Sequence, residues 1–344
     1  MSSEIKLSVV MHTCRNDSPG QLPAPILQMM VDGIMAQEFS GAVELIIVDL
    51  LWERRHEEFD EILKRTALPA SGKPIPVLHV PDRSTPFKDE KLLRICSPKN
   101  TGILLARGTH VVFTDDCQVL PKTGLARLAQ WAEKGFGATT NYEKRIFAKD
   151  GNHRVTGSDL RGVQLGVHAG TGRNVSTRAI GFLGGTLSML PLEALLALNG
   201  WDEGFDGSRQ LEDGDMIVRL GLYGQKMAYE NRNTVVEYEV GNYDKNVVRT
   251  QPIKCNGAYA QHVWKQNRVL ANTGYDAETI ERMAWGDCIR LTEGGRCSPH
   301  NGECTHLGNP EQLARIFTDE RLVFDLREER KRINWDNALD ILSA

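Results

Sequence analysis

Four short apolar runs, each followed by a helical pattern, constrain the fold of this chain more than any other feature. They are rich in β-branched residues and end in polar or turn residues, as buried parallel strands do. The runs are LSVVMH (7–12), VELIIVD (43–49), PVLHV (76–80) and THVVFTDD (109–116). Helix-like segments follow at 26–37, 57–65, 97–106 and 125–132. This alternation predicts an α/β fold with a mostly parallel, Rossmann-like sheet flanked by helices.

Polar side chains stand where three of these strands end. His12 closes the first run, Asp49 closes the second, and Asp115 with Asp116 closes the fourth. Ligands of doubly wound sheets bind in the crevice beyond the carboxyl ends of the strands. We therefore expect these three strand ends to converge on one binding crevice.

The adjacent carboxylates Asp115 and Asp116 suggest a cation site. Two neighbouring carboxylates repel each other, so a divalent cation is their natural partner. Mg²⁺ or Mn²⁺ takes oxygen ligands and shares them with substrate phosphates. We assign Asp116 as the metal ligand, whereas Asp115 faces the other way along the strand and suits a ribose or a metal-bound water. The alternative is that one of the pair caps a helix starting near Pro121.

The rest of the chain is less regular. Residues 141–185 are polar and glycine-rich, which predicts long loops with one hairpin at most. Pro191 is expected to start a helix, and a second helix follows Glu212 and Asp213. A strand is expected at 234–240. We place a boundary near Gly241, with one domain over 1–240 and a C-terminal helical and loop extension over 241–344.

Four segments in this order resemble family 2 glycosyltransferases of the GT-A fold. The first three are LSVVMHT, VELIIVD, and NTGILLARG followed by TDD with a proline five residues after its second aspartate. The fourth and most specific is GFLGGTLSMLPLEALLALNGWDEGFDGSRQLEDGDMIVRLGLYGQKM. The resemblance covers about residues 5–240 and implies a donor half at 1–120 and an acceptor half at 121–240.

The resemblance implies a metal-dependent, inverting glycosyltransferase of the hexosyltransferase class. Its donor would be a nucleotide diphosphate sugar, with UDP favoured by family habit, and its metal Mn²⁺ or Mg²⁺. The base would be Asp213, although a carboxylate there also suits a helix cap. Because Cys117 interrupts the family's Asp-x-Asp pattern, metal binding depends mainly on Asp116. The implied donor contacts are His12, Thr13, Asp49, Arg94 and Asp115, and the implied acceptor contacts are Trp201, Asp202 and Glu212.

Three further groups of residues have two possible roles each. Lys91 and Arg94, ahead of the Asn-x-Gly segment, could face the diphosphate or lie on a solvated helix face. His262 could be a further metal ligand or an ordinary packed histidine. A cysteine and histidine cluster near the C-terminus could bind a structural Zn²⁺ or be reduced and unliganded, since its spacing fits no standard zinc pattern. The cluster comprises Cys288, Cys297, His300, Cys304 and His306.

Composition excludes several classes. Hydrophobic residues make up 41% and charged residues 25%, as in ordinary folded proteins. The formal charge of −4 provides no overall attraction to nucleic acid or an anionic membrane. The most apolar stretch, 182–198, is interrupted by proline and glutamate, so no membrane span is expected. The N-terminus does not read as a signal peptide, and seven scattered cysteines suit a cytoplasmic protein.

Other functions fit the sequence less well. A nucleotidyltransferase needs a glycine-rich phosphate loop after the first strand, where HTCRNDSPG has one glycine. A dehydrogenase needs G-x-G-x-x-G at the same place. Two alternatives stay open: an inactive transferase-like protein that binds a sugar or a partner, and a transferase acting on a modified nucleic-acid base. The acceptor could be a saccharide, lipid, peptide or modified base.

Overall fold

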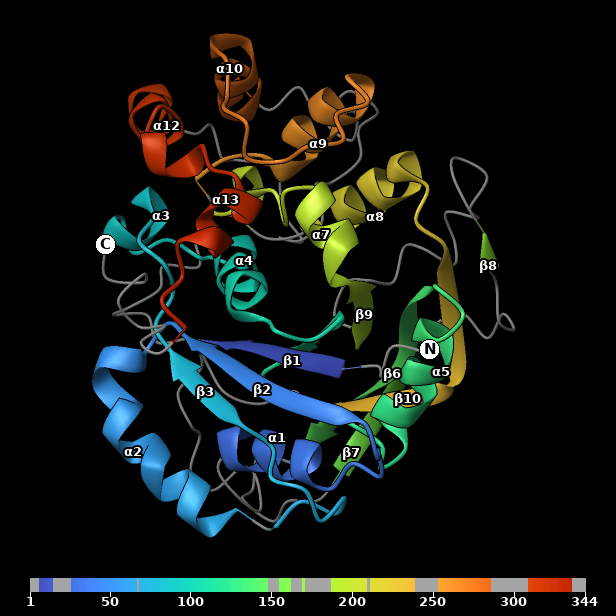
Figure 1. Ribbon diagram of the computed structural model, residues 1–344. Coiled ribbons are helices and arrows are strands. Elements are labelled where there is room, and N and C mark those ends of the chain that lie inside the picture. Colours follow the sequence, from blue (N-terminus) through green and yellow to red (C-terminus); the bar gives the residue numbers. More distant parts are fainter. Residues whose placement is uncertain are drawn as a thin grey trace.

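The computed structural model describes residues 6–14, 26–66, 68–147, 155–161, 169–170, 187–208, 211–238, 253–285 and 309–335 (Figure 1). Its strands are β1 (Lys6–Thr13), β2 (Ala42–Asp49), β3 (Val77–Val80), β4 (His110–Asp115), β5 (Gln118–Val119), β6 (Gly137–Phe147), β7 (Val155–Arg161), β8 (Ala169–Gly170), β9 (Ser188–Pro191) and β10 (Met227–Tyr238). Its helices are α1 (Ile26–Met35), α2 (Trp52–Arg65), α3 (Pro86–Asp89), α4 (Cys96–Leu105), α5 (Gly124–Ala132), α7 (Leu192–Ala197), α8 (Glu212–Tyr223), α9 (Asn256–Lys265), α10 (Ala277–Trp285), α12 (Pro310–Phe317) and α13 (Leu326–Lys331), with single 3₁₀ turns at Glu203–Phe205 and Glu320–Leu322.

The strands form one mixed sheet in the order β3-β2-β1-β4-β9-β6-β10-β5. The first four in this order are parallel to one another, which confirms the α/β expectation. Beyond β4, β9 runs antiparallel to both β4 and β6, and β10 is parallel to β6. The parallel half thus keeps the carboxyl ends of β1, β2 and β4 together at one edge.

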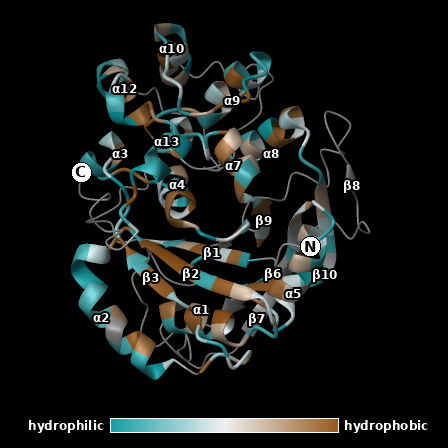
Figure 2. Ribbon diagram, in the orientation of Figure 1, coloured by the Kyte–Doolittle hydropathy of each residue, from teal (hydrophilic) through white to brown (hydrophobic). Residues whose placement is uncertain are grey.

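Two hydrophobic cores lie on opposite faces of the sheet. In Figure 1, α1 and α2 cover one face, while α4 and the C-terminal helices cover the other. Side chains alternate between the faces as the pleat requires: Val9 of β1 packs with α1, and Val10 packs with α4. Figure 2 shows the central strands as predominantly hydrophobic. Helices on both faces explain why these strands are apolar throughout.

The element predictions hold for the parallel half. All four strands and the helices at 26–37, 97–106 and 125–132 are confirmed to within two residues at each end. Helix α2 begins five residues before the expected 57, because its first turn is too charged to show an apolar periodicity. The hairpin expected within 141–185 is formed by β6, which continues to Phe147, and the antiparallel β7.

The C-terminal helices share a core with the sheet. The boundary expected near Gly241 lies outside the described residues. Beyond it, Tyr259, Leu313 and Leu326 belong to the same buried cluster as Val10 of β1. Within the described ranges, no helix has both the length and the apolar character needed to cross a membrane.

Candidate functional site

The carboxyl ends of β1, β2 and β4 bring the expected strand-end residues together. The register places His12 beside Asp115 and Thr13 beside Asp49. Asp116 follows directly after β4, and its Oδ2 accepts a 2.9 Å hydrogen bond from the Thr13 hydroxyl. Four of the side chains expected at the donor and the expected metal ligand therefore occupy one edge of the sheet.

Arg55 of α2 connects Asp49 with Thr13. Its Nε and Nη2 donate to the two oxygens of Asp49 at 2.6 and 2.9 Å, and Nη2 also donates to Thr13 Oγ1 at 3.1 Å. Thr13 in turn donates to Asp116. The proton of the Thr13 hydroxyl is thus directed toward Asp116 because its oxygen faces a permanent cation.

Asp49 is buried, with 1% of its surface exposed. Besides Arg55, its carboxylate accepts from His79 Nε2 at 2.9 Å and from the Leu51 amide at 2.8 Å. Burial alone would raise the pKa of Asp49, but the hydrogen bonds from His79 and Arg55 hold it below its usual value. We expected this carboxylate to contact a nucleotide base; in the structure its oxygens are engaged inside the protein.

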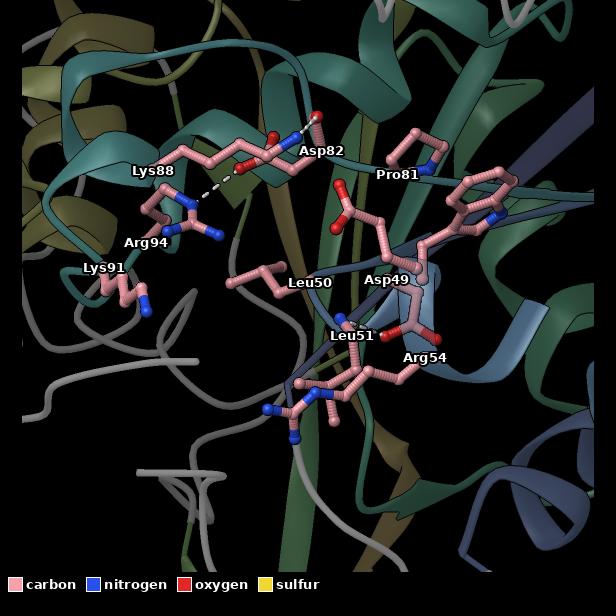
Figure 3. Close-up of a pocket in the computed structure, with 11 residues that line it drawn as sticks. Asp49, Leu50, Leu51, Arg54, Pro81, Asp82, Lys88, Lys91 and Arg94 are labelled. Carbon is pink, nitrogen blue, oxygen red and sulfur yellow. Dashed lines mark hydrogen bonds and ion pairs between the residues drawn. The ribbon is translucent and has the colours of Figure 1, made fainter. Parts of the chain in front are cut away.

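A pocket of about 270 Å³ opens beside these strand ends. Figure 3 shows three cationic side chains on one side and Asp49 and Arg54 across from them, the cations being Lys88, Lys91 and Arg94. Arg94 is buried and donates from Nε to Asp82 Oδ2 at 2.9 Å. Lys91 is exposed. Its lining carries charges of both signs, with Arg54, Lys88, Lys91 and Arg94 as cations and Asp49, Glu53 and Asp82 as anions.

Asp213 lies in the first turn of α8 and faces α4 across the site. Its Oδ1 accepts from Lys99 Nζ at 3.2 Å, and its side chain is 18% exposed. The Lys99 ammonium also lies 3.9 Å from the ring centroid of Trp201, close enough for a cation–π contact. The expected base therefore remains accessible to solvent while one of its oxygens is held by a cation.

The electrostatics link Asp213 to the strand ends. Burial lowers the pKa of His12, against the attraction of the Asp115 charge, and Asp213 also acts on His12. Burial and the neighbouring Asp213 charge raise the pKa of Glu212 to about 8. His12 therefore lies within range of the charges of both Asp115 and Asp213.

Both helix-cap alternatives are wrong. Helix α8 begins at Glu212 with Leu211 in the cap position, and no side chain caps it. Asp213 is paired with Lys99 instead. Helix α5 begins at Gly124 after Thr123, also without a side-chain cap, and Asp116 is bound by Thr13. These two carboxylates are therefore not used as helix caps.

Trp201 and Asp202 have different surroundings from those we expected at the acceptor. Trp201 is fully buried. Asp202 is a structural anchor: Oδ2 accepts from Tyr259 at 2.6 Å and from Arg268, and Oδ1 accepts from Tyr275 at 3.0 Å. Neither side chain reaches the cleft surface, so this part of the prediction is corrected. The Gly-Trp-Asp-Glu turn instead attaches the C-terminal helices.

The Asn-x-Gly segment is bound to the same turn. Asn100 donates to the Trp201 carbonyl at 2.9 Å and accepts from the Trp201 amide at 2.7 Å. Two residues on, Gly102 lies so close to β1 that an added Cβ would overlap Val10. These contacts hold together in space two motifs that are 101 residues apart in the sequence. They also fix the position of Lys99, the residue before Asn100.

A divalent cation at Asp116 would need further ligands from outside the protein. Among the described residues no three His, Cys, Asp or Glu side chains are grouped to hold a metal by themselves. Mg²⁺ commonly takes one or two carboxylates and completes its shell from substrate phosphates and water. His262 donates or accepts at Thr279 Oγ1 of α10, 3.0 Å away. The expected zinc cluster, Cys288, Cys297, His300 and Cys304, lies outside the described residues.

Comparison with solved structures identifies the fold. S. aureus TarS residues 1–349 in complex with UDP-GlcNAc superposes with a TM-score of 0.53 at 13% identity, over 98% of this chain and 91% of the TarS 1–349 chain. The chain has the GT-A fold. The complex of TarS 1–349 with UDP gives a TM-score of 0.50 at 13% identity, over 98% and 90% of the two chains. No family model and no curated protein matches the sequence.

Within this GT-A fold, Lys99 and Arg55 were missed by the sequence reasoning. Lys99 lies in α4, a helix whose ten residues are all buried, and a lysine in such a helix needs a partner. This burial is seen only in the folded structure, and the neighbouring Pro98 and Asn100 give no indication of Asp213 as the partner. Arg55 lies on a helix dense in charged residues, where nothing in the sequence marks it out.

Proposed function

We propose that this protein is a metal-dependent, inverting glycosyltransferase that uses a UDP-sugar donor. The observation that carries the proposal is the joint arrangement of Asp116 after β4 and Asp213 at the start of α8 around one site of a GT-A fold. The likeness to TarS, which has been solved with UDP-GlcNAc and with UDP, supports a uridine diphosphate donor.

The donor is assigned to the strand-end edge. The pocket near Arg94 would take the nucleotide, with Lys88 and Lys91 available to its negative charge. Asp115 and His12 would contact its ribose and base. Because Asp49 is already saturated by protein donors, we assign it the role of fixing Arg55 and Thr13.

Asp116 would hold a divalent cation jointly with the donor diphosphate. When bound, such a cation offsets the charge that develops on the departing diphosphate. Thr13 orients the Asp116 carboxylate through its hydroxyl. Orientation by a second residue of this kind is a common determinant of metal affinity.

Asp213 would act as the general base. It accepts the proton of the acceptor hydroxyl, whose oxygen forms a bond to the anomeric carbon on the face opposite the diphosphate. The bond from that carbon to the diphosphate breaks, and its electron pair leaves with UDP. A positioned base contributes about 10²- to 10⁴-fold in rate. The Glu212 carboxyl, next to the base, would contact the acceptor.

A thermal-shift screen tests the donor assignment. UDP, GDP and dTDP are compared with and without Mn²⁺, since a ligand at 100 times its Kd stabilises the folded state by about 2.7 kcal/mol. We expect UDP with Mn²⁺ to give the largest rise in Tm. Asp116→Asn should lose the Mn²⁺-dependent part, and Glu58→Gln, a change of an exposed carboxylate on α2, should not. Equal rises in wild type and Asp116→Asn would contradict the proposal.

A further inference from the structure

Lys99 lies at the junction between the donor half and the expected base. It projects from α4, yet only 6% of its surface is exposed. Its Nζ is 3.2 Å from Asp213 Oδ1 and 3.9 Å from the ring centroid of Trp201. Since Asn100 holds the Trp201 backbone from the adjacent position, the ammonium has little freedom to move. The fold therefore places a buried cation against the base.

We propose that Lys99 is a positioning residue, which holds the Asp213 carboxylate in place for its role as base. This inference rests on the proposed function, because it assigns Asp213 the role of base. It adds a residue on α4 to the acceptor side of the reaction. A positioning residue of this kind acts on the acceptor through Asp213 and need not touch the acceptor itself.

The charged groups that face Asp213 support this assignment. They are Lys99 of α4, Glu212 of α8 and His12 of β1, and Asp115 of β4 acts on Lys99. Burial alone would lower the pKa of Lys99, but the charges of Asp213 and Glu212 raise it above its ordinary value, so the ammonium stays charged. Burial lowers the pKa of His12. Among the described residues that face Asp213, Lys99 is therefore the cation that stays charged.

The carboxyl next to Asp213, that of Glu212, is shifted toward its protonated form. Both carboxyls occupy the first turn of α8, and Glu212 is buried, with 8% of its surface exposed. Burial and then the Asp213 charge raise the pKa of Glu212 to about 8. Lys99 bonds directly to Asp213, and this contact holds one carboxylate oxygen of the expected base.

The geometry also leaves the base usable. Lys99 occupies Oδ1 of Asp213, and among the described residues no hydrogen-bond donor is recorded at Oδ2. Asp213 is 18% exposed, whereas Lys99 is 7% exposed when side chains alone are counted. One oxygen is therefore fixed inside the protein, and the other remains available to an acceptor hydroxyl.

Carboxyl ¹³C NMR tests the inference without any need for turnover. Aspartate is labelled at the side-chain carboxyl, and Asp213→Asn assigns the Asp213 resonance in the metal-free protein. In Lys99→Met, which keeps the aliphatic cover over Trp201, the acid dissociation constant of Asp213 should fall by about tenfold or more. Lys99→Arg should keep it within threefold of wild type. An Asp213 titration that is unchanged in Lys99→Met would overturn the inference.

A replacement variant and a binding measurement support the interpretation of the NMR result. Lys99→Gln replaces the methionine variant if the latter does not fold, as judged by its melting curve. Isothermal titration with UDP and Mn²⁺ tests the competing role, in which Lys99 binds the diphosphate: a UDP affinity at least tenfold weaker, with Asp213 titrating as in wild type, would assign that role and refute ours. We expect the UDP affinity to stay within threefold.

The kinetic readout separates this inference from the proposed function. If a UDP-sugar is turned over, the acid limb of the pH–rate profile should move to higher pH in Lys99→Met, because the base has lost its neighbouring cation. Lys99→Arg should restore the wild-type profile. If the wild-type protein turned over no nucleotide sugar, the proposed transferase function would be refuted. The NMR measurement would still test the pairing of Lys99 with Asp213 independently.

Discussion

Replacing Glu212 by glutamine should make the protein progressively more stable than wild type as the pH rises. Burial and the Asp213 charge raise the pKa of Glu212 to about 8 from an ordinary value of 4.5. A carboxyl with a raised pKa favours the folded state while it is protonated, and this contribution is lost as the pH rises from 4.5 through 8. Glutamine resembles the protonated carboxyl in shape and never ionises.

The magnitude follows from the shift. With these two pKa values, ionisation of Glu212 costs the folded state about 4 kcal/mol between pH 5 and pH 9. Coupling to Asp213 and Lys99 makes this an upper value, so we expect the difference between Glu212→Gln and wild type to change by about 2 to 4 kcal/mol over this range. The direction of the change is fixed: Glu212→Gln becomes more stable relative to wild type as the pH rises.

Urea unfolding at pH 5, 6, 7, 8 and 9 provides the measurement. Glu58→Gln, which changes an exposed glutamate on α2, is the matched control. The stability difference for Glu212→Gln should increase steadily with pH, with most of the change above pH 6. A difference that is constant across the range, or that favours wild type at pH 9, would refute the electrostatic account of the Glu212–Asp213 pair.

Three further changes test the supports of the site. Gly102→Ala should lower the free energy of unfolding by about 1 to 3 kcal/mol in urea titrations, because its Cβ overlaps Val10, and an unaffected stability would contradict the close packing of α4 on β1. Arg55→Met should cost about 3 kcal/mol by the same measurement, since it leaves the buried Asp49 charge without its guanidinium; a loss below 1 kcal/mol would argue against that pairing. Thr13→Val should weaken Mn²⁺ affinity in the presence of UDP by about 10-fold in calorimetric titrations, while an unchanged affinity would show that its hydroxyl does not orient the metal ligand.

The parallel half of the sheet could be predicted from the sequence because its information is local. Runs of β-branched residues bounded by polar residues specify buried strands, and the ends of β1, β2 and β4 specify where a site forms. The grouping of His12, Asp115 and Asp116 at one edge of the sheet therefore required no knowledge of distant contacts. The hairpin of β6 and β7 was more difficult to predict from the sequence, because both strands carry polar residues at alternate positions of either parity.

The partners of the site residues could not be predicted in the same way. Lys99 and Asp213 are 114 positions apart, and Asp202 and Arg268 are 66 apart, so no local period relates them. Trp201 and Asp202 carry a recognisable motif, but the motif does not say whether they face the acceptor or the interior. In this chain the added C-terminal helices supply Tyr259 and other donors that enclose Asp202.

Enzymatic turnover in Asp213→Asn, measured with donor binding on the same protein, tests the central claim most directly. UDP release from a UDP-sugar is followed in the presence of Mn²⁺, and the affinity for UDP is measured by calorimetry. If Asp213 is the base, the rate should fall by about 10²- to 10⁴-fold while the UDP affinity stays within threefold of wild type. Turnover at the wild-type rate in Asp213→Asn would contradict the assignment of the base and with it the proposed mechanism.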